Sequence, residues 1–166
     1  MPESPTPEPV AEAVINLVVN GEPTELKIRS SWTLQYVLHD VLGLFGTKDF
    51  CNEGACGACA VIIEGRPVLA CMTLAIECDG KAVETVEGIA KAGHPLVETY
   101  VKYHCMQCGF CTPGFVVTAK ALLDRNPDPS DDEIRQALAG NLCRCGTYPQ
   151  HVLAVKEAAE TLRGGK

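Results

Sequence analysis

Ten cysteines in a chain of 166 residues restrict its fold more than any other feature of the sequence. A disulfide framework is one explanation, but such frameworks are typical of shorter chains with an export signal. The N-terminus has no basic stretch followed by an apolar one, so we predict no signal peptide. The thiols are therefore expected to be reduced and available to bind metal.

Four cysteines in the first half have the spacing of a plant-type 2Fe-2S site. Cys51, Cys56 and Cys59 form C-x4-C-x2-C, and Cys71 follows after eleven intervening residues. Two glycines lie between the ligands, where a tight loop needs unusual backbone angles. Zinc also binds four cysteines, but structural zinc sites usually combine two separated C-x2-C pairs. The spacing therefore favours an iron–sulfur cluster.

A second set of four cysteines lies at predicted helix boundaries in the second half. Cys108 and Cys111 form C-x2-C, and Cys143 and Cys145 form C-x-C. Two adjacent helix turns can meet and supply four thiolates, and helix N-termini favour an anionic centre. This spacing alone also suits zinc, so the residues themselves leave the metal open.

The remaining thiols are Cys78 and Cys105. Together with Cys108 and Cys111, Cys105 begins like a 4Fe-4S loop, but Phe115 stands where the fourth cysteine of that motif belongs. Four better-placed thiols make a complete set without Cys105. We therefore interpret Cys78 and Cys105 as small buried apolar side chains.

The first half has the pattern of a small mixed α+β domain. Residues 1–12 are rich in proline and glutamate and are predicted to form a disordered tail. Alternating apolar residues on both sides of Asn20-Gly21 predict a β-hairpin, and a helix is expected over 34–42. The strands expected after this helix are 60–63, 67–70 and 82–85. Together these elements predict a domain over residues 13–88.

Helical periodicity replaces the strand pattern after a linker expected at 87–93. Thr112-Pro113 predicts a helix start with Thr112 as the N-cap, and Ser130 with Glu133 forms a capping box. An earlier helix is expected to have an inward face made of Leu96, Val97, Tyr100, Val101 and His104. The last helix is expected to start at Pro149 and direct inward Val152, Val155, Ala159 and Leu162. We predict an all-α, four-helix second domain over residues 89–166.

Charge and composition exclude several functions. The net charge of −7 argues against nucleic acid or an anionic membrane surface as a partner. No apolar run approaches the roughly 18 residues that a membrane-spanning helix needs. None of the four histidines belongs to a catalytic arrangement, and no nucleophile–base pair or phosphate loop is present. We therefore predict no catalytic residues and no substrate chemistry on this chain.

These motifs resemble the small iron–sulfur subunit of the molybdenum hydroxylase (xanthine oxidase) family. The resemblance extends from about Val14 to Val155 and is specific, because two differently spaced 2Fe-2S sites in this order are rare elsewhere. The matching segments are 46–48, 51–59, Cys71, 107–114 and 139–145.

The resemblance implies a β-grasp ferredoxin-like domain and a four-helix domain, each with one 2Fe-2S cluster. It implies that the helical-domain cluster lies nearest a molybdopterin on a large subunit, where Gln107 and Cys145 contact the pterin. The other cluster would pass electrons onward, to FAD on a medium subunit or to a cytochrome. The chain departs from the common family pattern at Phe50, where glycine is frequent, and at Gly146-Thr147-Tyr148, where Thr-Gly-Tyr is frequent.

Two other functions remain as hypotheses. A stand-alone 2Fe-2S carrier or redox sensor would contain the same clusters without an enzyme partner, although the sequence has no visible output module. A structural module with two zinc ions would use the same eight thiols. We expect a cytoplasmic protein, with periplasmic export alongside a partner subunit as the alternative.

Overall fold

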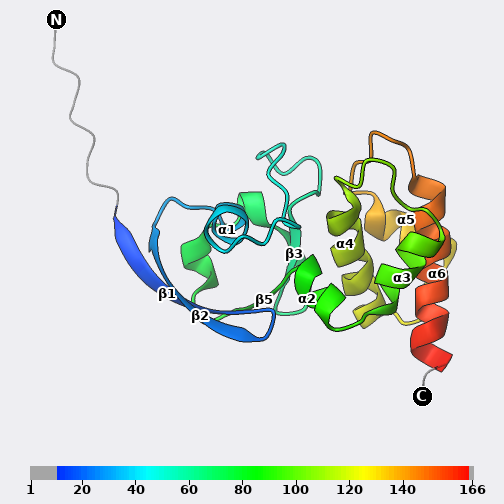
Figure 1. Cartoon of the computed structure of the whole chain (residues 1–166), viewed down its shortest axis with the longest axis horizontal. Helices are drawn as coiled ribbons and strands as arrows, with labels where there is room; N and C mark the ends of the chain where they lie inside the picture. The colour runs from blue at the N-terminus through cyan, green and yellow to red at the C-terminus, as the bar shows by residue number, and fades with distance from the viewer. Residues whose placement is uncertain (1–10, 165–166) are drawn as a thin grey trace, which may run out of the picture.

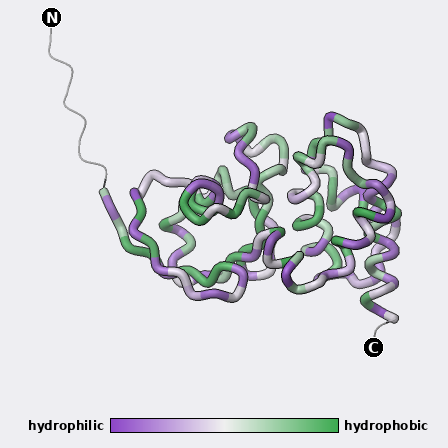
Figure 2. The backbone as a smooth tube through the Cα atoms, in the orientation of Figure 1, coloured by the Kyte–Doolittle hydropathy of each residue, from purple (hydrophilic) through white to green (hydrophobic). Residues whose placement is uncertain are grey.

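The computed structural model of the chain describes residues 11–164. Figure 1 shows a strand-rich half next to a bundle of helices, with the chain passing from the first to the second through α2. Each half has its own hydrophobic core, and hydrophobic stretches run through both halves in Figure 2. The predicted α+β fold class, with a ferredoxin-like domain followed by a helical domain, is confirmed.

The ferredoxin-like domain starts with the predicted hairpin. β1 (Glu12–Val19) and β2 (Glu22–Arg29) are antiparallel. Asn20 and Gly21 take the positive φ angles of 52° and 85° that a tight hairpin turn requires. Residues 1–10 of the predicted tail lie outside the described residues, and Glu12 already belongs to β1.

Five strands form one sheet in the order β2-β1-β5-β3-β4. The three strands that follow the hairpin are β3 (Ala60–Ile63), β4 (Arg66–Leu69) and β5 (Ala82–Glu84). β5 pairs parallel to β1 and antiparallel to β3, so the end of the domain lies in the middle of the sheet.

A helical segment packs its apolar side chains into the core of this sheet. α1 (Leu34–Tyr36) continues as a π-helical turn, η1 (Val37–Val41), and the Thr33 hydroxyl caps its start. Two 3-10 turns follow β4: η2 (Ala70–Met72), which carries Cys71, and η3 (Ala75–Cys78). This sheet grasping a helix is the β-grasp arrangement.

The helical domain contains α3 (Pro95–Lys102), α4 (Thr112–Arg125), α5 (Asp131–Leu138) and α6 (Tyr148–Gly164). The predicted capping box is confirmed, since Ser130 and Glu133 each bind the other's backbone N–H at the start of α5. Phe115 and Ile134 are fully buried in the core of this domain. Within residues 11–164, no helix has the length and apolar character needed to cross a membrane.

Several predictions about the helices are wrong in detail. The linker expected at 87–93 is largely helical, because α2 (Val86–Lys91) buries Ile89 in the helical core. Val101 is 62% exposed, and Leu162 is 39% exposed, so neither side chain faces inward. His104 lies beyond the end of α3 with a φ of 51°. The N-cap of α4 is Cys111 and not Thr112, whose buried hydroxyl has no hydrogen-bond partner in the described part of the chain.

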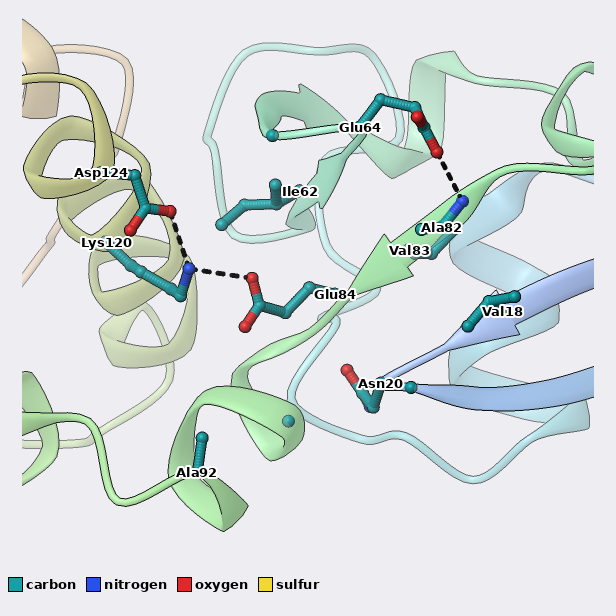
Figure 3. Close-up of a pocket in the computed structure, with 13 residues that line it drawn as sticks. Val18, Asn20, Ile62, Glu64, Ala82, Val83, Glu84, Ala92, Lys120 and Asp124 are labelled. Carbon is teal, nitrogen blue, oxygen red and sulfur yellow. Dashed lines mark hydrogen bonds and ion pairs between the residues drawn. The ribbon is translucent and has the colours of Figure 1, made fainter.

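The two domains meet where α4 packs on β3, and Ala60 and Ile62 of β3 belong to the helical core. Away from the cysteines, Lys120 of α4 reaches across the boundary to Glu84 of β5 at 3.1 Å, and it also contacts Asp124 at 2.7 Å (Figure 3). These residues line a pocket in which no cysteine takes part. The domain boundary is thus closed by apolar packing and by an ion pair.

Candidate metal centres

The first set of thiols lies in an irregular loop between η1 and β3. Cys51, Cys56 and Cys59 belong to this loop, and Cys71 reaches them from η2. The thiols lie in two pairs close enough to share a hydrogen bond: Cys51 with Cys56, and Cys59 with Cys71. Gly54 has a φ of 77°, as expected for a residue that bends the loop around the thiols.

Backbone hydrogen-bond donors and burial have opposite effects on the pKa values of these thiols. The backbone N–H of Glu53 lowers the pKa of the Cys51 thiol to about 7, so that this thiol readily becomes a thiolate. Burial raises the pKa of Cys59 to about 12. A thiol so deeply buried gives up its proton when a bound cation compensates the charge, which is how cysteine binds metal.

The second set lies where two helix connections meet. Cys108 and Cys111 precede α4, and Cys143 and Cys145 lie between α5 and α6. The Sγ atoms of Cys108 and Cys145 are 3.6 Å apart, and Cys111 shares a hydrogen bond with Cys143. The sequence therefore predicted correctly that these two turns meet.

The pKa values in the second set follow the same physics. The backbone N–H of Phe110 lowers the pKa of Cys108. Burial raises the pKa of Cys111 to about 12. Burial also acts on Cys143, but hydrogen bonds from Thr147 and Gly146 outweigh it and lower the pKa of this thiol to about 7.

The chemistry of both sets fits a two-iron cluster. Within residues 11–164, no three His, Cys, Asp or Glu side chains are grouped around a position for a single metal ion. Each set instead consists of two thiol pairs, which suits two irons that take two terminal thiolates each. All ten cysteines are unbridged, so no disulfide competes for these ligands.

The loops that carry the two sets are joined by one backbone and one side-chain hydrogen bond. The N–H of Leu142 donates a 2.9 Å hydrogen bond to the carbonyl oxygen of Cys56, and Asn141 Nδ2 donates a 3.0 Å bond to that of Gly57. A Cβ atom on Gly57 would lie 2.5 Å from the Gly140 carbonyl oxygen. The domains can therefore approach this closely only with glycine at position 57.

Comparison with known proteins agrees with this geometry. Residues 23–102 match the 2Fe-2S iron-sulfur cluster binding domain, and residues 85–156 match the 2Fe-2S binding domain. The small FeS subunit of nicotinate dehydrogenase from Eubacterium barkeri is 45% identical over 88% of this chain and 94% of its own length.

Solved structures give the same result. A chain of quinoline 2-oxidoreductase from Pseudomonas putida 86 superposes with a TM-score of 0.88 and 39% identity, over 93% of this chain and 98% of that one. Aldehyde oxidoreductase from Desulfovibrio gigas also gives a TM-score of 0.88, with 41% identity, over 93% of this chain but 18% of the longer one. The chain is a small iron–sulfur subunit of the molybdenum hydroxylase family.

The iron–sulfur subunit therefore transfers electrons within a multi-subunit oxidoreductase. It has 2Fe-2S binding domains. Its membership of this family implies a large partner subunit that carries the molybdopterin. Substrate chemistry takes place outside this chain.

The pterin-contact residues implied by the family resemblance lie together in the iron–sulfur subunit. Gln107 is exposed, and its Nε2 donates a 3.5 Å hydrogen bond to the carbonyl oxygen of Cys145. Next to them is a cavity of about 560 Å³ whose wall includes Phe110, Leu142 and Arg144. Phe50, which replaces the frequent glycine, packs edge-to-face on Phe110 at 5.5 Å between ring centroids.

The two remaining cysteines are buried away from both sets. Cys78 and Cys105 are both 0% exposed, as expected for small apolar side chains. The Cys78 thiol donates to the Leu74 carbonyl oxygen at 3.7 Å, and burial raises the pKa of Cys105 to about 12.

Sequence reasoning missed the polar residues that surround Cys143. Its backbone N–H donates to the Tyr148 hydroxyl at 2.8 Å, and its Sγ contacts the Thr147 hydroxyl at 3.3 Å. Beyond Thr147 lies His151, which is 1% exposed. Thr147 directly precedes α6 and His151 lies in its first turn, so the spacing of four residues between them is the signal that could have revealed this pair.

Proposed function

We propose that two thiol sets hold the two 2Fe-2S clusters of this subunit. The ligands of the ferredoxin-like domain are Cys51, Cys56, Cys59 and Cys71. The ligands of the helical domain are Cys108, Cys111, Cys143 and Cys145. Each cluster supplies one-electron chemistry, and the protein tunes its potential by burial and by N–H···S hydrogen bonds.

The observation that carries this function is the hydrogen bond from Leu142 N–H to the Cys56 carbonyl. Leu142 directly precedes Cys143, so a short route of covalent bonds and one hydrogen bond joins a ligand of one set to a ligand of the other. Asn141, which is 4% exposed, holds the same junction through Gly57. An electron can thus pass between the domains without crossing solvent.

We propose that the helical domain faces the molybdopterin of the large subunit. Cys108 is exposed and Cys145 is partly exposed, whereas Cys143 is buried in the helical core. Gln107 lies at the exposed side, where its amide is available to a polar pterin edge. Gln107 and Cys145 are therefore the proposed pterin contacts.

The acceptor is proposed to dock near Cys51, at the opposite end of the route. Met72, next to Cys71 in sequence, is 63% exposed, so this apolar side chain is available to a protein interface on the side of the ferredoxin-like domain. We favour a medium subunit with FAD as this acceptor, with a cytochrome as the alternative outcome of reconstitution.

Two further points belong to the same proposal. We propose that the domains are 13–88 and 89–166, because Ile89 of α2 is fully buried in the helical core. We propose a cytoplasmic location, since unbridged cysteines persist in a reducing compartment. Fractionation of the source cells would instead find the protein in the periplasm if it were exported with a partner.

Iron analysis and electron paramagnetic resonance test the assignment. The reduced holoprotein should contain about four irons per chain and give two distinguishable S = 1/2 signals. Cys108→Ser should remove only the signal of the helical domain, and Cys51→Ser only that of the ferredoxin-like domain. Loss of both signals from a folded single variant, or a colourless zinc protein, would contradict the assignment.

A further inference from the structure

A buried polar chain leads from Cys143 to the first turn of α6. Cys143 Sγ lies 3.3 Å from Thr147 Oγ1, and Thr147 Oγ1 lies 3.2 Å from His151 Nε2. The three side chains are 9%, 4% and 1% exposed. Thr147 and His151 bind no metal in the proposed assignment, so this chain needs a separate explanation.

The surroundings of His151 fix its charge and tautomer. Its ring stacks on Phe115 with 4.0 Å between centroids and 8° between planes, and its buried Nδ1 atom has no hydrogen-bond partner among residues 11–164. Burial lowers the pKa of His151 to about 4, so the imidazole is neutral and has a single N–H. Nδ1 is unpaired in either tautomer, and buried N–H groups are left unpaired less often than buried acceptors, so the tautomer with the proton on Nε2 is favoured.

This tautomer determines the direction of both hydrogen bonds. His151 Nε2–H donates to Thr147 Oγ1. The hydroxyl hydrogen of Thr147 is then free to donate to Cys143 Sγ. His151 therefore orients the hydroxyl, and the hydroxyl contacts the sulfur.

We propose that Thr147 and His151 are positioning residues that raise the reduction potential of the helical-domain cluster through an O–H···S hydrogen bond to Cys143. The proposal rests on the assignment of Cys143 as a ligand. Reduction adds negative charge to a cluster and its thiolates, and a donor aimed at a ligand sulfur stabilises that charge. The outer residues of a metal site commonly act in this way, by orienting the group that touches the ligand.

The loop around Cys143 supports this role. Backbone N–H groups of Gly146 and Thr147 also point at its sulfur, and the Tyr148 hydroxyl holds its backbone N–H at 2.8 Å. These contacts fix the backbone, whereas His151 fixes the rotation of the Thr147 hydroxyl. In the frequent family order Thr-Gly-Tyr, the threonine would stand at position 146. In this chain Gly146 stands there, and the threonine follows at position 147, next to Cys143 Sγ.

A redox titration of the holoenzyme followed by electron paramagnetic resonance tests the proposal. Thr147→Val keeps the shape of the side chain but has no O–H. It should shift the midpoint potential of the helical-domain signal to lower values and leave the ferredoxin-like signal unchanged. Thr147→Ser should restore the wild-type value. Thr161→Val is the matched control, because the exposed Thr161 hydroxyl bonds the Glu157 carbonyl within α6.

His151→Leu provides a second measurement that leaves Thr147 in place. It should shift the same signal in the same direction by a smaller amount, and it decides the matter if Thr147→Val fails to assemble the cluster. Unchanged potentials in either assembled variant, or equal shifts of both signals, would overturn the proposal. A Cys143→Ser variant that keeps the helical-domain signal would instead show that the ligand assignment is wrong.

Discussion

The backbone N–H of Leu142 lies 2.9 Å from the carbonyl oxygen of Cys56 and donates a hydrogen bond to it. Cys56 belongs to the cysteine loop of the ferredoxin-like domain, and Leu142 to that of the helical domain. Because this contact links the two cysteine loops, the electron route depends on how the two domains are positioned. The contact in turn requires that residue 57 has no side chain.

Gly57→Ala should weaken this junction. Its φ of 72° strains any L-residue, and the new Cβ would lie 2.5 Å from the Gly140 carbonyl oxygen and 2.7 Å from Asn141 Nδ2. We expect the free energy of unfolding to fall by about 3 kcal/mol, from backbone strain and overpacking. Transfer of an electron between the clusters should slow as the loops separate, which pulse radiolysis can measure.

Gly65→Ala is the matched control for this substitution. Gly65 has nearly the same φ, 75°, but no atom of the described residues lies within 4 Å of a Cβ atom there. Only the strain of about 1 kcal/mol should remain, with unchanged transfer between the clusters. Equal effects of the two substitutions on the transfer rate would disprove the role of close approach at Gly57.

Cys105→Ala and Cys78→Ala should keep both clusters. Both thiols are fully buried outside the proposed ligand sets, so each substitution should lower stability by about 1 kcal/mol and retain about four irons per chain. Iron analysis and electron paramagnetic resonance of the purified variants check this outcome. If Cys105→Ala lost iron, a cluster held by Cys105, Cys108 and Cys111 would have to be reconsidered.

Local signals made much of this molecule predictable. Asn20-Gly21 sets its own turn, and Ser130 with Glu133 marks a helix start, because both features act over a few adjacent residues. The cysteine spacings were informative for the same reason. The loops at 51–59, 108–111 and 143–145 each supply two or three thiols within a short stretch of chain, whereas the joining of the last two loops is not local.

Features that depend on contacts between the domains were missed. α2 has six residues, too few to show a periodic pattern, and Ile89 is buried by helices that come later in the chain. The need for glycine at position 57 arises from residues 140 and 141. Val101 illustrates the opposite error, since it has the right spacing for a buried face but lies 62% exposed.

Lys120→Met should loosen the domain boundary on the side away from the cysteines. The Lys120 side chain is 16% exposed and bridges Glu84 and Asp124, which are themselves 32% and 43% exposed. Because water screens both carboxylates, we expect a loss of about 1 kcal/mol, measured by denaturant unfolding. Lys27→Met is the control: its pair with Glu12 is exposed on both sides, so its effect should be near zero.

The pKa of His94 should respond to the same Lys120 substitution. Burial lowers this pKa below its ordinary 6.5, and the positive charge of Lys120 lowers it further, against the opposing effect of Asp124 and Glu84. Removing the cation should therefore raise the pKa of His94. Proton NMR titration of the oxidised protein measures it, and an unchanged value in Lys120→Met would contradict this coupling.

The lowered pKa of His94 also predicts how stability depends on pH. The unfolded chain binds a proton near pH 6.5, while the folded protein resists it, so stability should fall as the pH drops from 6.5 toward the folded-state pKa. His94 is the N-cap of α3, where its Nδ1 accepts from the Leu96 N–H at 3.2 Å. His94→Asn keeps a cap acceptor without a titrating group. Its stability should vary less over this pH range than that of the wild type, and equal slopes would show that His94 does not contribute.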